Sequence, residues 1–206
     1  MLYIFIRTCP RDDSIGRIAY ESLIRIYPDA TFVFLAEKGP YKHLVGDAVF
    51  RDHADNFGGH AGVRNLLWTM QRMNIPLQED DLVFLSDADI VAWDSVLDKL
   101  DGIDHAGVVT THRWNLCHIS GQFQILRGGF LKRLLALTNP EIDSIVHEMV
   151  AKGIDVADDT FISLMSDRWG LTKKDVCAWT HEKFYEFNGR TDYDAVLKIL
   201  RNRPLR

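Results

Sequence analysis

The sequence predicts an α/β fold with a mainly parallel central sheet and helices on both of its faces. Short apolar segments that are rich in strand formers alternate along the chain with amphipathic segments at helical spacing. Strands that alternate with helices pair in parallel, because each helix carries the chain back to the edge where the next strand starts. The length of 206 residues and the hydrophobic content of 47% suit a single domain with its own core.

The amino-terminal half contains four expected strands, at residues 2–6, 31–35, 48–50 and 82–85. Between the first two strands, apolar residues from Ile15 to Ile26 recur at helical spacing, and Pro28 ends that helix. A glycine-rich stretch at residues 56–62 leads into a second helix at residues 63–73. This half therefore predicts the order of a parallel sheet.

The carboxyl-terminal half adds two expected strands, at residues 107–111 and 122–126. Its expected helices are at residues 95–100, 130–137, 141–152, 158–166 and 192–200. We expect one domain over residues 1–206, with residues 182–206 as a helical appendage at the carboxyl end. The basic residues in that appendage suit either a solvated helix end or contact with an anionic surface.

Composition argues against several classes of protein. The net charge of −5 gives no overall electrostatic attraction for nucleic acid. The cysteines are Cys9, Cys117 and Cys177, an odd number without a C-x-x-C motif, so a disulfide framework and a structural zinc site are poorly supported. The start of the chain lacks the features of a secretory signal, and no apolar run is long enough to span a bilayer. These features predict a cytoplasmic protein.

The motif with the clearest chemistry is the acid pair Asp87 and Asp89, which directly follows the buried strand at residues 82–85. Ligands of open α/β sheets bind beyond the carboxyl ends of the strands. Carboxylate oxygens are the ligands that Mg²⁺ and Mn²⁺ prefer, and such ions commonly bind substrate phosphates as well. The pair therefore predicts a Mn²⁺ or Mg²⁺ site, with a solvated acidic turn as the alternative.

Three segments in order resemble family 2 glycosyltransferases, which have the Rossmann-like glycosyltransferase A fold. Asn-Phe-Gly at residues 56–58 is similar to the Asn-x-Gly loop of that family. Val-Arg-Asn at residues 63–65 is similar to its Ala-Arg-Asn helix start, and residues 87–89 match its D-x-D motif. The resemblance implies a metal-dependent glycosyltransferase that uses a nucleotide sugar, a UDP- or GDP-sugar. The acceptor stays open among glycans, proteins, lipid-linked molecules and nucleobases.

The resemblance also implies catalytic and metal-binding residues. The pair Asp158 and Asp159 resembles the Glu-Asp motif of inverting transferases, in which the second acid is the general base. Asp159 is thus the expected base, with Asp158 as its structural partner; an ordinary helix cap is the alternative. A late histidine is a further metal ligand in many such folds, which makes His181 the candidate beside Asp87 and Asp89.

Contacts with the donor follow from the same resemblance. Residues 7–13, after the first strand, would hold the base and ribose, and Gly121 would let a ligand approach the backbone. Glu37 stands where family 2 usually has an aspartate. The expected donor-binding residues are Arg7, Thr8, Asp13, Arg64, Ser86, Asp87, Gly121 and Gln122.

Other classes of protein share parts of this pattern. A haloacid-dehalogenase-type phosphohydrolase also carries D-x-D after a strand, but usually near the start of the chain, whereas Asp87 lies far along it. A nucleotidyltransferase would show a glycine-rich loop after the first strand, and residues 7–13 contain no glycine. A binding module without catalytic activity is the remaining alternative.

Overall fold

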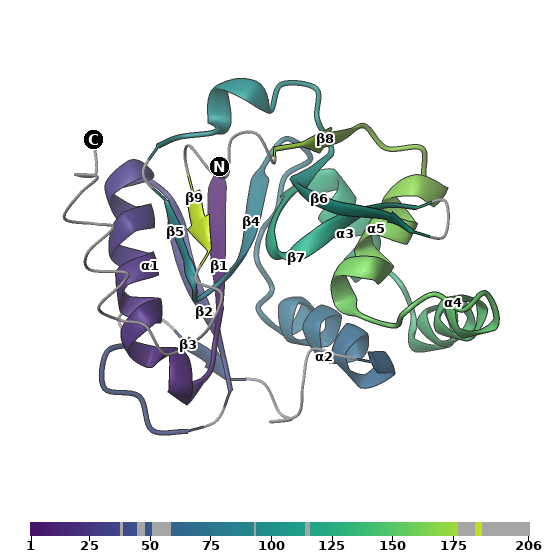
Figure 1. The fold of residues 1–206 in the computed structure, drawn as a ribbon, viewed down its shortest axis with the longest axis horizontal. Coiled ribbons are helices and arrows are strands. Elements are labelled where there is room, and N and C mark those ends of the chain that lie inside the picture. Colours follow the sequence, from purple (N-terminus) through teal and green to yellow (C-terminus); the bar gives the residue numbers. More distant parts are fainter. Residues whose placement is uncertain are drawn as a thin grey trace.

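The computed structural model describes residues 1–37, 39–44, 48–50, 59–92, 94–113, 116–176 and 184–186. Its centre is a seven-stranded sheet in the order β3-β2-β1-β4-β7-β6-β8 (Figure 1). These strands are β1 (Leu2–Thr8), β2 (Thr31–Ala36), β3 (Ala48–Phe50), β4 (Leu82–Asp87), β6 (His105–Arg113), β7 (Leu116–Arg127) and β8 (Lys173–Asp175). A small antiparallel sheet joins β5 (Ile90–Ala92) to β9 (Phe184–Glu186).

Parallel pairing dominates the large sheet, as predicted. Strand β1 runs parallel to β2 and β4, β2 runs parallel to β3, and β6 runs parallel to β8. Strand β7 is antiparallel to both of its neighbours, β4 and β6. The connection from β6 to β7 is too short for a crossover, so these two strands can pair only in antiparallel fashion. The strands expected at residues 107–111 and 122–126 are thus parts of this longer hairpin.

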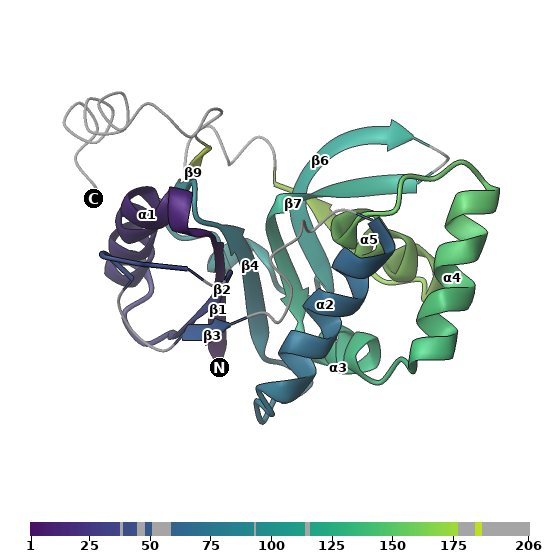
Figure 2. The same ribbon diagram turned by 90° about the horizontal axis from the view of Figure 1, so that it is seen from below.

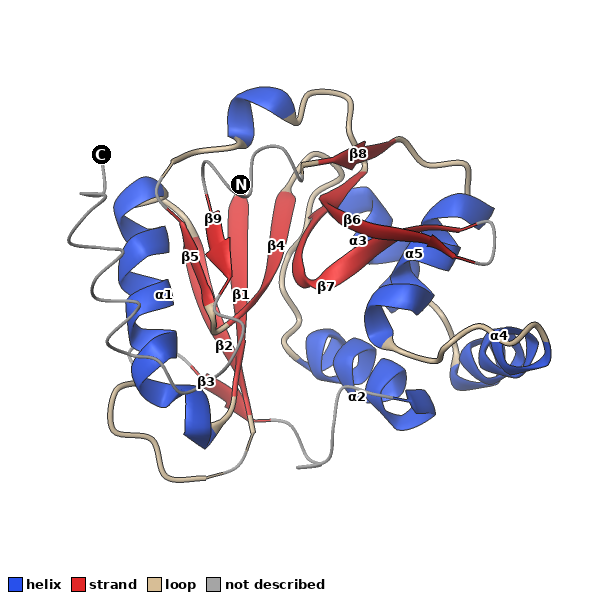
Figure 3. Cartoon of the chain, viewed as in Figure 1, coloured by secondary structure: helices blue, strands red, loops and turns tan. Residues whose placement is uncertain are grey.

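Helices cover both faces of the sheet, which confirms that part of the prediction. They are α1 (Asp13–Ile26), α2 (Gly59–Arg72), α3 (Gly128–Leu135), α4 (Asn139–Ala151) and α5 (Asp158–Arg168). Helix α1 lies on one side with β5 and β9, and α2 to α5 gather on the other (Figures 2 and 3). Within the described ranges, no helix combines the length and apolar character needed to cross a membrane.

Two short elements differ from their predicted form. The helix expected at residues 95–100 is a single 3-10 turn at Leu97–Lys99. Residues 184–186, inside the expected helical appendage, form strand β9 and pair with β5. The helix expected at residues 192–200 lies outside the described residues.

Strand alternation decides which side chains of β1 reach which group of helices. Tyr3 and Phe5 belong to the core under α2 to α5, while Ile4 and Ile6 belong to the core under α1. Because successive side chains point to opposite faces, Arg7 follows Phe5 onto the face with α2 to α5. The end of β1 therefore carries a cation on that face.

Strand β4 repeats the pattern. Val83 and Leu85 pack in the core under α2 to α5, and alternation places Asp87 on the same face. The register of the parallel pair sets Arg7 directly opposite Asp87. A cation and a carboxylate thus meet at the carboxyl ends of the two central strands.

Candidate active site

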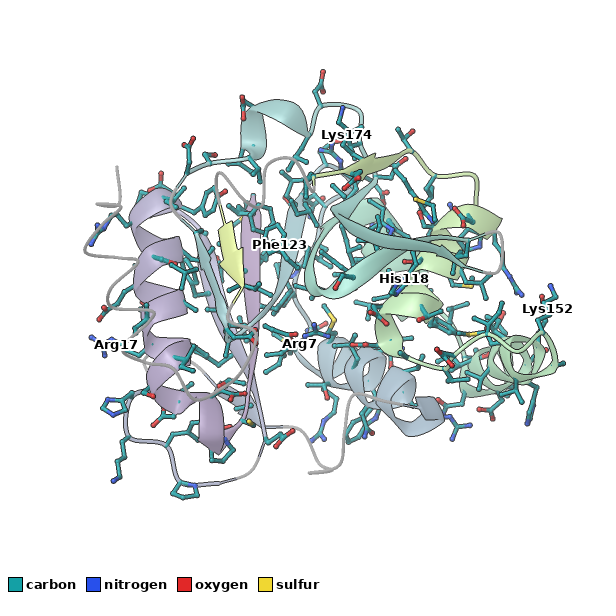
Figure 4. The ribbon with its side chains drawn as sticks, in the orientation of Figure 1. Arg7, Arg17, His118, Phe123, Lys152 and Lys174 are labelled. Atoms are coloured by element: carbon teal, nitrogen blue, oxygen red, sulfur yellow. The ribbon has the colours of Figure 1, made fainter. Side chains whose placement is uncertain are left out.

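A single buried guanidinium, that of Arg7, joins four elements at the carboxyl end of the sheet. Its Nη1 atom donates to Oδ2 of Asp158, at the start of α5, over 2.6 Å. Its Nη2 atom lies 2.8 Å from Oδ1 of Asp87 and also donates to the backbone carbonyl of Gly121 in β7. Arg7 is only 5% exposed. Figure 4 labels Arg7 together with His118, a second member of this site.

Negative charge exceeds positive charge around this guanidinium. Burial raises the pKa of Asp87 to about 7, opposed by Arg7 and reinforced by the nearby charges of Asp89 and Asp158. Burial likewise raises the pKa of Asp158, with Arg7 opposing and Asp159 adding to the shift. Burial lowers the pKa of Arg7, but the negative charges of Asp87, Asp158 and Asp159 raise it by more. The pKa of Arg7 is therefore raised overall. A positive ligand at this site would relieve the repulsion between the carboxylates.

Asp159 is held by hydrogen bonds from two elements. Its Oδ2 atom accepts the backbone amide of Gly121 at 2.9 Å and lies 3.2 Å from Nε2 of His118. Its Oδ1 atom accepts the amide of Thr160 at 2.7 Å. Burial alone would raise the pKa of Asp159, but the contacts with His118, Gly121 and Thr160 lower it. Asp159 is therefore ionised at neutral pH.

Gly121 lets β7 approach α5 closely. A Cβ atom at this position would lie 3.1 Å from both Cβ and Oδ2 of Asp159. The close approach expected at Gly121 is therefore made by the Asp159 side chain. His118 was missed in the sequence; its one signal is its place three residues before Gly121, a predicted donor-binding residue.

The D-x-D turn is anchored to β1 through the backbone as well. Strand β4 ends at Asp87, residues 88 and 89 form a turn, and the chain re-enters the fold at β5. The Ala88 amide donates to the carbonyl of Arg7 at 3.0 Å. Asp87 is 33% exposed on its side chain, and Asp89 is half-buried. The two carboxylates thus lie at the open edge of the sheet.

A divalent cation fits the chemistry of this turn. Asp87 and Asp89 supply oxygen atoms, and the uncompensated charge around them favours a cation. Among the residues that the structure describes, no three metal-ligating side chains form a group. The predicted third ligand, His181, lies outside the described residues. A cation here would be held by Asp87 and Asp89 and would offset the charge of a bound diphosphate.

The predicted nucleotide loop packs against the segment that follows β2. The carboxylate of Asp13 accepts the backbone amides of Lys42 at 2.5 Å and His43 at 2.9 Å. The carbonyl of Thr8 accepts the amide of Glu37 at 3.1 Å, and the Thr8 side chain is buried. In this structure Asp13 and Thr8 therefore fix the shape of the loop, and binding of a nucleotide by them stays a prediction.

Other predicted donor-binding residues lie in different surroundings. Ser86 is fully buried and donates to the carbonyl of Asp87 at 3.1 Å, so strand alternation withdraws its side chain from any ligand. Arg64 pairs with Asp143 of α4. The backbone of Gln122 lies in β7, but its side chain is outside the description. The predicted residues that the structure brings into contact are Arg7, Asp87, Gly121, Asp158 and Asp159.

No protein-family model matches the chain, and no curated protein matches its sequence. Solved structures do match. The galactosyltransferase LgtC, in complex with donor and acceptor sugar analogues, aligns over 98% of this chain and 84% of its own, with 13% identity and a TM-score of 0.57. An active-site mutant of LgtC aligns over 84% of this chain and 73% of its own, also with 13% identity, with a TM-score of 0.56.

A second glycosyltransferase, GlyE of Streptococcus pneumoniae TIGR4, aligns over 98% of this chain at 10% identity, with a TM-score of 0.52. This chain spans about half of GlyE, since 53% of the GlyE chain is covered. At such low identity the likeness concerns the fold. The sheet order, the cluster of acids at its carboxyl end and these structures together show that the chain has the glycosyltransferase A fold.

Proposed function

We propose that this chain is a glycosyltransferase that moves a sugar from a UDP- or GDP-sugar to an acceptor, with Mn²⁺ or Mg²⁺ held by Asp87 and Asp89. The observation that carries the proposal is the D-x-D turn at the exit of a central strand, beside a buried and incompletely compensated cluster of carboxylates. The fold shared with LgtC, whose structure contains donor and acceptor sugar analogues, favours transfer over the phosphohydrolase alternative.

The first proposed role, stabilising the negative charge of the leaving group, belongs to the cation site at Asp87 and Asp89. The leaving group of a nucleotide sugar is a nucleoside diphosphate, whose negative charge grows as the bond to the sugar breaks. A divalent cation stabilises that charge when bound. Asp87 and Asp89 lie at the edge of the sheet where ligands of α/β folds bind, so the diphosphate would lie beyond the ends of β1 and β4.

The second role belongs to the acids at the start of α5. We propose that Asp159 accepts the proton of the acceptor hydroxyl, which makes inversion the predicted outcome. Asp159 is ionised, as a base must be, and the amide of Gly121 fixes its position. Its Oδ2 atom also contacts His118, so binding of the acceptor would have to replace or share that contact.

The proposal is tested with a panel of UDP- and GDP-sugars, each with Mn²⁺ and with a chelator. At least one donor should raise the melting temperature in the presence of Mn²⁺ and lose that effect with the chelator, because a ligand that binds the native state stabilises it. The same donor should release nucleoside diphosphate when glycan, protein and lipid-linked acceptors are supplied. If no nucleotide sugar binds with or without metal, the proposal is wrong.

A further inference from the structure

Arg7 contacts protein groups with both of its terminal nitrogen atoms. Nη1 donates to Asp158 and Nη2 contacts both Asp87 and the carbonyl of Gly121. The side chain is 4% exposed. This buried guanidinium therefore links three other elements of the site through its contacts with Asp158, Asp87 and Gly121. The sequence had instead indicated a contact between Arg7 and the nucleotide.

Asp87, the first acid of the D-x-D motif, is one of the two carboxylates that Arg7 holds. The guanidinium contacts Oδ1 of Asp87, while the side chain of Asp87 keeps 33% of its exposure. The backbone of Arg7 also fixes the next residue, because its carbonyl accepts the Ala88 amide at 3.0 Å. Arg7 therefore restrains the D-x-D turn through its side chain and its main chain, and leaves the Asp87 carboxylate accessible.

We propose that Arg7 is a positioning residue that orients Asp87 for the divalent cation and ties this carboxylate to Asp158 at the start of α5. The inference rests on the proposed function, since it takes the cation to bind at Asp87 and Asp89. Hydrogen-bond partners of a metal ligand set its orientation and commonly change metal affinity when they are removed. The planar fork of arginine can hold two carboxylates at once, which the compact ammonium group of lysine does less well.

Charge and geometry predict opposite effects of Arg7 on the cation. As a positive charge alone, Arg7 would repel a cation, so its loss would strengthen cation binding. As a positioning group, its loss would weaken binding. Arg7→Lys keeps the charge and removes the fork, and so it isolates the effect of geometry.

The experiment measures Mn²⁺ binding without substrate, by the electron paramagnetic resonance signal of the free ion. We expect Arg7→Lys to weaken Mn²⁺ binding by about 10- to 100-fold. The matched control is Arg17→Lys on the surface of α1, where Arg17 pairs with the exposed Glu21 one turn away. That variant should bind Mn²⁺ as the wild type does. Circular dichroism and urea unfolding establish that both variants are folded.

A second measurement uses the wild type alone and so does not depend on how a variant folds. Hydrogen exchange is followed with and without Mn²⁺ at the amides of Gly121 and Asp159. If Arg7 ties the metal site to β7 and α5, Mn²⁺ should slow exchange at these amides although neither residue is a proposed ligand.

The outcomes distinguish the proposed function from the positioning role of Arg7. A wild type that does not bind Mn²⁺ contradicts the proposed function, and the inference falls with it. A wild type that binds Mn²⁺, with unchanged or tighter binding in folded Arg7→Lys, overturns the role of Arg7 alone. Unchanged exchange at Gly121 and Asp159 overturns the tie to α5.

Discussion

Carboxylates gather at both ends of the central sheet, but in different ways. At the carboxyl end of β4, the acids Asp87 and Asp158 share the buried guanidinium of Arg7. At the amino end of β4 there is an open cleft of about 470 Å³, whose acidic and basic lining residues are Glu79, Asp80, Asp101, Asp104, Arg127 and Arg133. Cleft size alone would favour the second region.

Several charges of the open cleft are satisfied separately. Glu79 pairs with the exposed Lys132, and Asp104 accepts the amide of Thr172 at 2.9 Å. Arg127 donates to backbone carbonyls of the adjoining loop, one at 2.7 Å and one at 3.1 Å. At the other end the buried guanidinium of Arg7 serves two carboxylates, of which Asp158 is buried and Asp87 partly exposed, and the pKa values of both are raised. Shared and buried charge, rather than an open cavity, therefore marks the candidate active site.

The largest expected difference between the two ends is in metal-dependent binding. Asp89→Ala should abolish the effect of Mn²⁺ on donor binding and with it the transfer reaction, because one of two carboxylate ligands is lost. Asp101→Ala, at an exposed position of the open cleft, should leave both unchanged. Binding is measured by thermal shift and turnover by release of nucleoside diphosphate. Equal losses in the two variants would remove the distinction between the ends.

Asp159→Asn tests the proposed base. An amide cannot take the acceptor proton, so transfer should fall by about 100-fold or more. Donor and metal binding should stay close to wild type, because Asp159 is not a proposed metal ligand. Steady-state kinetics, donor titration and the anomeric configuration of the product are the measurements. Near-normal turnover, or a product that retains the configuration of the donor, would contradict the assignment.

The loss of stability in Asp158→Asn distinguishes a buried ion pair at Asp158 from a helix cap. The residue that caps α5 is Ala157, so the cap expected at Asp158 is wrong; its carboxylate instead pairs with Arg7 at 2.6 Å. Breaking a buried charge pair costs about 3–5 kcal/mol, against about 1 kcal/mol for a cap. We expect about 3 kcal/mol, at the low end because Arg7 retains Asp87 and because loss of the Asp158 charge relieves its repulsion with Asp159.

The control for that variant is Asp143→Asn, which breaks the more exposed pair between Arg64 and Asp143, with side-chain exposures of 40% and 32%. Such a pair is worth about 0–1 kcal/mol. Urea unfolding gives both values. Similar losses in the two variants would show that burial does not set the strength of the Arg7 contacts.

A further prediction is a pH dependence of the free energy of unfolding that belongs to Asp87. Its folded pKa of about 7 exceeds its ordinary value, so the folded protein binds this proton more tightly than the unfolded chain. Without metal, the free energy of unfolding should therefore fall as pH rises from about 4 to about 7. Asp87→Asn should remove that part of the slope. Asp158 contributes in the same direction but is present in both proteins, so parallel curves would contradict the shift at Asp87.

The alternation of apolar segments was enough to predict the sheet, the helices on both faces and the exit of β4 at the D-x-D motif. The hairpin of β6 and β7 was not predicted, because its two parts look like ordinary strands of a parallel sheet. The relative direction of the two strands depends on the short connection between them. The apolar pattern within each strand does not indicate that direction.

The site was predicted in its members more than in their roles. Arg7, Asp87, Asp158 and Asp159 are among the predicted residues, but the contact between Arg7 and Asp158 joins residues 151 positions apart. No local pattern reveals such a pairing. Arg7 was also assigned to a loop, whereas β1 continues to Thr8. Had the strand been extended, alternation would have placed Arg7 on the same face as Phe5, but its pairing with Asp87 depends on the register that the structure shows.

The most direct test of the account is the position of the metal in a crystal grown with UDP or GDP and Mn²⁺. The anomalous signal of manganese locates the ion without reference to any proposed ligand. We predict a peak between the carboxylates of Asp87 and Asp89, in contact with the diphosphate, and the same map would show whether His181 is a third ligand. A peak in the open cleft beside Asp101 and Asp104, or bound nucleotide with no manganese at the D-x-D turn, would contradict the account.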